Sequence, residues 1–343
     1  MRLVPLLLAD PSPCLRLLVL QELLRRSIND PEVLELNELL LTDPLIQELL
    51  EKQNKDGSWD GKNFITSSYH DKINTTSMVL TKLGFLGIKS DHPSIKNGIE
   101  YLFSLQKADG SWPIPSGRIR SVDSGYTMIP LQTAFPLKGI ASCGFSTDKR
   151  SENAYEWLFE QQLEDGAWPA GIKAGTRGFI AGYRKLPHSK WGCRSNTTAV
   201  LSALALHPKY RIDKRAKRAL DLLLGRETKE RHTLGFEVAR TIGVEPFQGY
   251  FTHYAKFDVA FILNLCWRVE ASKDDERISN IIEFICENQG DYGLWEYTPH
   301  PQASRWITFD LLRSLSRIDD SNDWLSLEPR TPFKPYSRKN KRF

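Results

Sequence analysis

Two kinds of helical pattern alternate along the chain. In the first kind, apolar side chains recur every three to four residues and charged side chains fill the other positions, which predicts helices with one face in solvent. These amphipathic segments are 93–106, 149–162, 213–225 and 274–289. The second kind is apolar on most sides, which predicts buried helices, and its segments start near Thr76, Thr133, Thr197, Asp258 and Thr308. We therefore expect an outer set of helices that alternates with an inner set.

A short phrase accompanies the amphipathic segments. It reads Gln, three residues, Gly, one residue and Trp, and its copies begin at Gln53, Gln106, Gln162 and Gln289. Glycine adopts the left-handed conformation at little cost and commonly ends a helix. The phrase therefore predicts a helix end, a turn and an anchoring Trp. Inner-helix starts precede the next phrase by about thirty residues, and Gly235-Phe236 stands where a degraded copy would place its Gly and Trp.

Helix pairs that recur in this way bury each inner helix against its neighbours, so the pairs stack side by side. Five inner helices with alternating outer ones, joined by an N-terminal helical pair in residues 1–43, predict an all-α fold, a closed α/α toroid. We expect one domain over residues 1–325, with the repeats in 44–320, followed by a basic tail in 326–343. The apolar start of the chain is short and contains Pro5, so we interpret it as a packed helix rather than a signal peptide.

Composition places the chain among ordinary globular proteins. Hydrophobic residues make up 41% and charged residues 26% of its 343 residues, and no apolar run reaches the length of a spanning helix. The five cysteines are odd in number and widely spaced, which favours free thiols in a reducing compartment, so we expect a cytoplasmic protein. The net charge of +4 is mild and much of it lies in the tail. Nucleic acid is not an expected partner, while peripheral membrane contact or a protein partner stays open.

The phrase resembles the QW motif of triterpene cyclases, and the repeat is similar to the α/α toroid of squalene and hopene cyclases and of protein prenyltransferase β subunits, over roughly residues 44–318. The resemblance implies a central apolar cavity for an isoprenoid. The Asp-x-Asp-Asp run by which such cyclases protonate their substrate is absent from this sequence, since Asp274-Asp275 and Asp319-Asp320 lack the leading Asp. Of the zinc ligands of prenyltransferases only Cys193 stands in place, so no cofactor is predicted and zinc is unsupported.

Two carboxyl groups are candidate acids. Asp258 shares a column with four threonines at the expected mouth of the ring, and a carboxyl beside Phe257 and Phe261 would have a raised pKa suited to protonating an alkene or epoxide. The alternative is that Asp and Thr in this column are helix N-caps. Asp123 is the second candidate acid, with a plain Asp-Ser-Gly turn as its alternative.

Two long inserts, 113–130 and 169–196, are where binding residues are expected. Arg184 and its basic neighbours could hold a diphosphate, and His188 and Cys193 with His253 could bind a metal or form a thiolate pair. We expect substrate contacts from the aromatic residues Tyr126, Trp191, Phe257, Phe261 and Trp306. The alternatives are solvated loop charge and ordinary core packing.

Two functions therefore remain open. The first is an isoprenoid-handling relative of cyclases or prenyltransferases, whose central cavity binds or transforms a hydrophobic isoprenoid. The second is a non-catalytic toroid that binds a lipid or a protein partner. The missing signatures leave open whether the protein is an enzyme.

Overall fold

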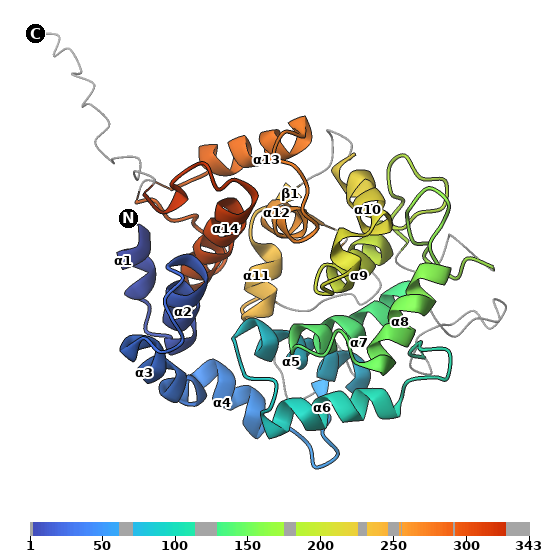
Figure 1. The fold of residues 1–343 in the computed structure, drawn as a ribbon, viewed down its shortest axis with the longest axis horizontal. Coiled ribbons are helices and arrows are strands. Elements are labelled where there is room, and N and C mark those ends of the chain that lie inside the picture. Colours follow the sequence, from blue (N-terminus) through green and yellow to red (C-terminus); the bar gives the residue numbers. More distant parts are fainter. Residues whose placement is uncertain are drawn as a thin grey trace, which may run out of the picture.

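In a computed structural model of the protein, the helices form a ring (Figure 1). The structure describes residues 3–61, 71–113, 129–174, 183–225, 232–245, 254, 256–290 and 292–326. The outer helices are α4 (Pro44–Glu51), α6 (Pro93–Ser104), α8 (Lys149–Glu160), α10 (Lys214–Leu224) and α13 (Glu276–Glu287). The inner helices are α5 (Lys72–Phe85), α7 (Pro130–Ser142), α9 (Arg194–Leu204), α12 (Val259–Arg268) and α14 (Ser304–Ile318). The predicted all-α toroid is confirmed.

The N-terminal segment lies between the last and the first inner helices (Figure 1). It contains α1 (Leu3–Leu8), α2 (Pro13–Leu18), which continues as a π-helical turn over Val19–Leu23, and α3 (Pro31–Leu39). Both α1 and the π-helical turn pack against α14. Pro at the first position and a side-chain cap from Ser12 or Asp30 start α2 and α3. The two ends of the described chain thus meet.

The repeated phrase has the same geometry in all four copies. Its Gln amide donates to the carbonyl of its own Gly, and its Trp indole donates to the carbonyl ten residues earlier at the end of the preceding outer helix. The Trp side chains are fully buried. In the first three copies the Gln also donates to a carbonyl in the first turn of the next outer helix, so it joins neighbouring repeats. These contacts hold Trp59, Trp112, Trp168 and Trp295 at equivalent places.

The threonine column has a different role from capping. Thr76, Thr133, Thr197 and Thr308 lie three to four residues inside their helices, and each hydroxyl accepts the backbone N–H of a phrase Trp at 3.0–3.2 Å. The N-cap interpretation is therefore wrong for the threonines and correct for Asp258, which caps α12. Pro136 lies in the middle of α7.

The fourth repeat departs from the others after Gly235. This Gly has a φ of 83°, in the left-handed region like the phrase glycines, but Glu237 rather than Phe236 occupies the Trp position two residues later. The Glu237 N–H donates to the Asp258 carboxylate at 2.6 Å, the counterpart of the Trp–Thr bonds. The chain then forms α11 (Phe236–Thr241), which lies at the centre of the ring (Figure 1). Two short strands pair in parallel here: β1 (His232–Thr233) lies just before Gly235, and β2 (Phe257–Asp258) leads into α12.

Candidate functional site

At the centre of the ring, described residues enclose a small cavity. Its volume is about 20 Å³, which is room for about one water molecule. Helices α5, α7 and α11 and Tyr254 enclose it, with the lining residues Met78, Thr81, Lys82, Phe135, Lys138, Glu237, Thr241 and Tyr254. The apolar central cavity that the resemblance implies is not confirmed, and charged side chains, Lys82, Lys138 and Glu237, line the small cavity instead.

These central charges pack against aromatic rings and one another. The Lys138 ammonium donates to the Tyr254 hydroxyl at 2.7 Å and lies 5.2 Å from the ring centroids of both Tyr254 and Phe261, which stack in parallel. Burial lowers the pKa of Lys138 to about 8. Glu237 and Arg240 form an ion pair of 2.9 Å one helical turn apart. The predicted residue Phe261 is therefore part of a packed, polar core.

Asp258 is 2% exposed and joins two helices. Its carboxylate accepts the backbone N–H groups of Gly235 and Glu237 at the start of α11 and of Ala260 and Phe261 at the start of α12. Burial and the Glu237 carboxylate raise the pKa of Asp258 to about 7. A proton on this group would compete with the four N–H donors for the same two oxygens. The geometry suits an acceptor, and a catalytic role for Asp258 stays a prediction.

The other predicted residues lie apart from one another. Trp191, Arg184, His188 and Cys193 belong to the segment that leads into α9; Arg184 and His188 are exposed, while Cys193 is buried and donates its N–H to the Trp168 carbonyl. Phe257 is buried in the short strand beside Asp258. No three His, Cys, Asp or Glu side chains of the described segments gather as metal ligands. Asp123, Tyr126 and His253 lie outside the described residues.

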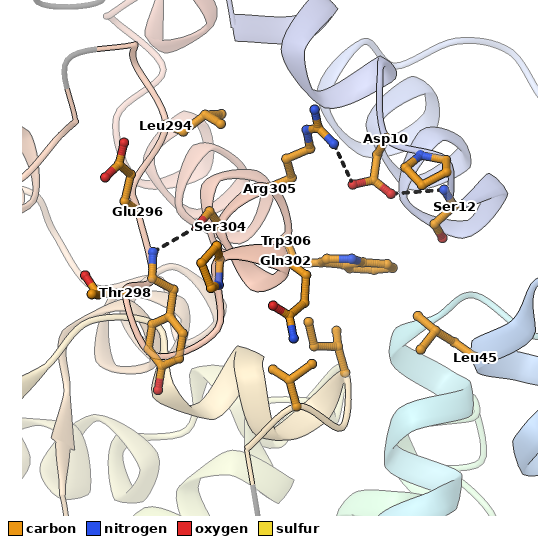
Figure 2. Close-up of a pocket in the computed structure, with 15 residues that line it drawn as sticks. Asp10, Ser12, Leu45, Leu294, Glu296, Thr298, Gln302, Ser304, Arg305 and Trp306 are labelled. Carbon is orange, nitrogen blue, oxygen red and sulfur yellow. Dashed lines mark hydrogen bonds and ion pairs between the residues drawn. The ribbon is translucent and has the colours of Figure 1, made fainter.

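A much larger pocket opens where the N-terminal segment meets the start of α14 (Figure 2). We call it the Trp306 pocket, and its volume is about 820 Å³. The end of α11 and the loop after Trp295 complete its wall. The lining residues are Asp10, Pro11, Ser12, Leu45, Ile242, Val244, Leu294, Glu296, Tyr297, Thr298, Pro301, Gln302, Ser304, Arg305 and Trp306.

The wall of the Trp306 pocket is held in place by packing on one side and hydrogen bonds on the other. Trp306 is 4% exposed, its ring lies 6.0 Å from that of Phe85 on α5, and it points into the same space as Leu45 (Figure 2). At the polar end, the Arg305 guanidinium lies 3.5 Å from the Asp10 carboxylate, which also accepts the Ser12 N–H. The pocket thus has an apolar side and a polar corner.

Charge in the pocket is slightly negative. Among its described lining residues, Asp10 and Glu296 are acidic and Arg305 is the single basic one. The Tyr297 hydroxyl donates to Glu245 at 2.7 Å, and burial together with this carboxylate raises the pKa of Tyr297, so the phenol keeps its proton. The site therefore offers hydrogen-bonding groups but little to neutralise a multiply charged anion.

Of the predicted site residues that the structure describes, only Trp306 lines this pocket. For the lining residues between Glu296 and Arg305, the sequence does contain a signal, which is their position. This stretch directly follows the last phrase Trp, just as the two long inserts follow Trp112 and Trp168. Asp10, Ser12 and Leu45 had no such signal, since they reach the site only when the ring closes.

The repeats are similar in sequence to a domain of known proteins. Residues 40–185 match the sequence model of the squalene-hopene cyclase C-terminal domain. The chain is 28% identical over 142 residues to a squalene–hopene cyclase of Zymomonas mobilis, covering 39% of this chain and 21% of that protein. It is 31% identical over 126 residues to a probable squalene–hopene cyclase of Sinorhizobium fredii, covering 36% of this chain and 19% of that protein. The match thus spans about a fifth of these relatives.

A solved type II terpene cyclase from Scytonema, in complex with geranylgeranyl dihydroxybenzoate, aligns with 82% of this chain and 72% of its own at 17% identity and a TM-score of 0.46. Among the described residues, no helix has both the length and the apolarity needed to cross a bilayer. The repeated Gln–Gly–Trp turns occupy equivalent places, and over residues 40–185 the repeats are similar to the squalene-hopene cyclase C-terminal domain.

Proposed function

We propose that the protein binds an uncharged isoprenoid in the Trp306 pocket and acts there as a cyclase-type protein. The observation that carries this proposal is the pocket itself, since sites for small organic ligands usually enclose about 300–1,000 Å³. Its volume of about 820 Å³ accommodates a branched hydrocarbon chain, and Trp306, Leu45 and Ile242 supply the apolar contacts. The names of the related squalene–hopene cyclases support the isoprenoid class.

The charges of the pocket favour a neutral head group over a diphosphate. Arg305 is the one basic residue among the lining residues and already lies beside Asp10, while Asp10 and Glu296 would repel an anion. A hydroxyl group, in contrast, can donate to a carboxylate and accept from the guanidinium without a net charge to desolvate. The proposed ligand is therefore a polyprenyl alcohol or a hydrocarbon of similar length.

A cyclisation also requires a proton donor. Asp258 has the raised pKa that this role needs, although it is not a lining residue of the Trp306 pocket and its oxygens already accept four N–H groups. Asp123 is the second candidate. The proposal therefore rests on binding first, and conversion of the bound molecule is its second part.

Isothermal titration calorimetry with geranylgeraniol and with geranylgeranyl diphosphate tests the binding. We expect the alcohol to bind at least tenfold more tightly than the diphosphate. Trp306→Ala removes an aromatic contact of about 1.5–3 kcal/mol and should weaken alcohol binding by roughly 10- to 100-fold. Trp191→Ala is the matched control, because this partly buried Trp lies outside the pocket. Unchanged binding by Trp306→Ala, or tighter binding of the diphosphate, contradicts the proposal.

A further inference from the structure

The outward side of α3 is unusually apolar for a surface helix. Val33, Leu36 and Leu40 bury the inward side, yet Leu34, Leu39 and Leu41 are 50%, 40% and 45% exposed. Glu35 and Glu38 stand between these leucines in the sequence and are exposed as well. Leu40 and Leu41 belong to the 3₁₀ turn Leu40–Thr42 that directly follows α3. We call Leu34, Glu35, Glu38, Leu39 and Leu41 the outer face of α3. Leucines in such a position mark a surface that another segment covers.

The charge of this face points to a basic occupant. Glu35 and Glu38 are three residues apart on one helix, a spacing at which like charges repel. Within the described part of the chain neither carboxylate has an ion-pair partner, whereas the neighbouring Glu32 lies 3.9 Å from Arg16. An anionic membrane surface would be repelled here. A basic segment that also carries apolar side chains would satisfy both features of the face.

The chain contains such a segment in residues 327–343. It holds six basic residues against one acidic residue, together with the aromatic side chains Phe333, Tyr336 and Phe343. Prolines at 329, 332 and 335 fix φ at three positions, which reduces the conformational entropy that docking would cost. Its composition therefore complements the outer face of α3 in both charge and apolarity.

The start of this segment lies within reach of α3. The 3₁₀ turn Trp324–Ser326 packs against α1, α1 packs against α2, and α2 packs against α3 (Figure 1). Neighbouring helices are about 8–10 Å apart, and the eight residues from Ser326 to Lys334 can span roughly 26 Å. A tethered segment is present at millimolar effective concentration, so weak contacts suffice to hold it.

We propose that residues 330–342 dock on the outer face of α3 in the same molecule. The lysines and arginines pair with Glu35 and Glu38, and the aromatic rings cover Leu34, Leu39 and Leu41. This intramolecular contact removes an exposed apolar patch from solvent. It is independent of the Trp306 pocket.

Zero-length carbodiimide cross-linking of the intact protein, followed by peptide mass spectrometry, tests this proposal because the reagent joins only a lysine and a carboxylate in contact. We expect links from Lys334, Lys339 or Lys341 to Glu35 or Glu38 in the monomer band. The links should fall several-fold at about 0.5 M salt, where the Debye length is roughly 4 Å. The double substitution Leu34→Ser and Leu41→Ser keeps both glutamates and should reduce the links at least threefold.

Leu105→Ser is the matched control, since Leu105 is an exposed leucine on a different outer helix end, and it should leave the links unchanged. Three results would overturn the proposal: links found only in a dimer band, links spread evenly over carboxylates elsewhere such as Glu276 and Glu283, or links unaffected by the double substitution. Circular dichroism of each variant verifies that the fold is intact.

Discussion

At the scale of single residues, one hydrogen bond organises each repeat. A buried backbone N–H after the left-handed glycine finds its acceptor on the next inner helix, a Thr hydroxyl in four repeats and the Asp258 carboxylate in the remaining one. A buried N–H without an acceptor costs about 1–3 kcal/mol, so this position strongly favours an oxygen-bearing side chain. The sequence column of Thr and Asp follows from that requirement.

Replacing Thr133 tests this bond. Thr133→Val keeps the shape of the side chain but leaves the Trp112 N–H without its acceptor, so the free energy of unfolding should fall by about 1–3 kcal/mol. Thr133→Ser keeps the hydroxyl and loses one methyl group, so it should cost less, about 1 kcal/mol. Urea denaturation of both variants gives the comparison. Equal losses would show that packing, rather than the hydrogen bond, selects threonine.

Asp258 makes the stability depend on pH in a defined direction. Because its folded-state pKa is about 7, above the ordinary value of 3.8, the folded protein binds more protons than the unfolded chain between those values. The unfolding free energy of the wild type should therefore fall, relative to Asp258→Asn, as pH rises from 4.5 to 7.5. The slope can reach about 1.4 kcal/mol per pH unit. Urea denaturation at four pH values within this range measures it.

Asp148→Asn is the control for this titration. Asp148 also caps a helix, but hydrogen bonds from Arg150 lower its pKa, so any change it causes lies at lower pH and the difference should be flat between 4.5 and 7.5. If instead the wild type gains stability with rising pH relative to Asp258→Asn, the four N–H donors lower the pKa of Asp258 by more than burial raises it. In that case Asp258 is ionised throughout and cannot be a proton donor near neutral pH.

At the scale of elements, the turn formed by each repeated phrase requires its glycine for two reasons, backbone conformation and close packing. Gly110 has a φ of 89°, and a Cβ there would lie 2.4 Å from the Asn153 carbonyl oxygen on α8. The phrase therefore sets both the left-handed turn and the close approach of the next outer helix. This is why the phrase recurs in step with the helices.

Two alanine substitutions separate these effects. Gly87 has a φ of 84°, but a Cβ there would meet only the Leu18 side chain, at 4.0 Å. Gly87→Ala should therefore lower the free energy of unfolding by about 1–2 kcal/mol, from backbone strain alone. Gly110→Ala adds a backbone clash that should cost about 1–3 kcal/mol more. Thermal and urea unfolding provide both values. If both variants lose the same free energy of unfolding, the turn at Gly110 can move away from the Asn153 carbonyl at no cost.

The elements differ in how far the sequence predicts them. Amphipathic periods locate α6, α8, α10 and α13 closely, because one solvent face and one buried face leave a clear pattern. The buried α11 was missed, since six residues are too few for a period and Glu237 replaces the Trp that marks the other turns. The role of the threonines was also missed, because a cap and an acceptor one turn later look alike in sequence.

At the scale of the whole molecule, the ring closes through residues that are distant in sequence. Arg305 lies beside Asp10 and Arg317 pairs with Glu22, each across 295 positions of the chain. The Trp306 pocket forms at this closure. The place of Glu296–Arg305 after the last phrase Trp marks one wall of the pocket, but no local pattern points to Asp10, Ser12 or Leu45. The sequence singles out Asp258 as a candidate acid. It does not predict the four backbone N–H groups that its carboxylate accepts, because the tertiary fold brings two of them from the start of α11.

Photoaffinity labelling tests the location of the ligand most directly. Geranylgeraniol carrying a diazirine near its hydroxyl would be bound, irradiated, and the labelled peptides mapped by mass spectrometry. The account predicts labels on the Leu294–Trp306 stretch and near Asp10 or Leu45, reduced by excess unlabelled alcohol and by Trp306→Ala. Labels confined to α7, α9 or the segment 183–193, with none on the Trp306 pocket, would contradict it.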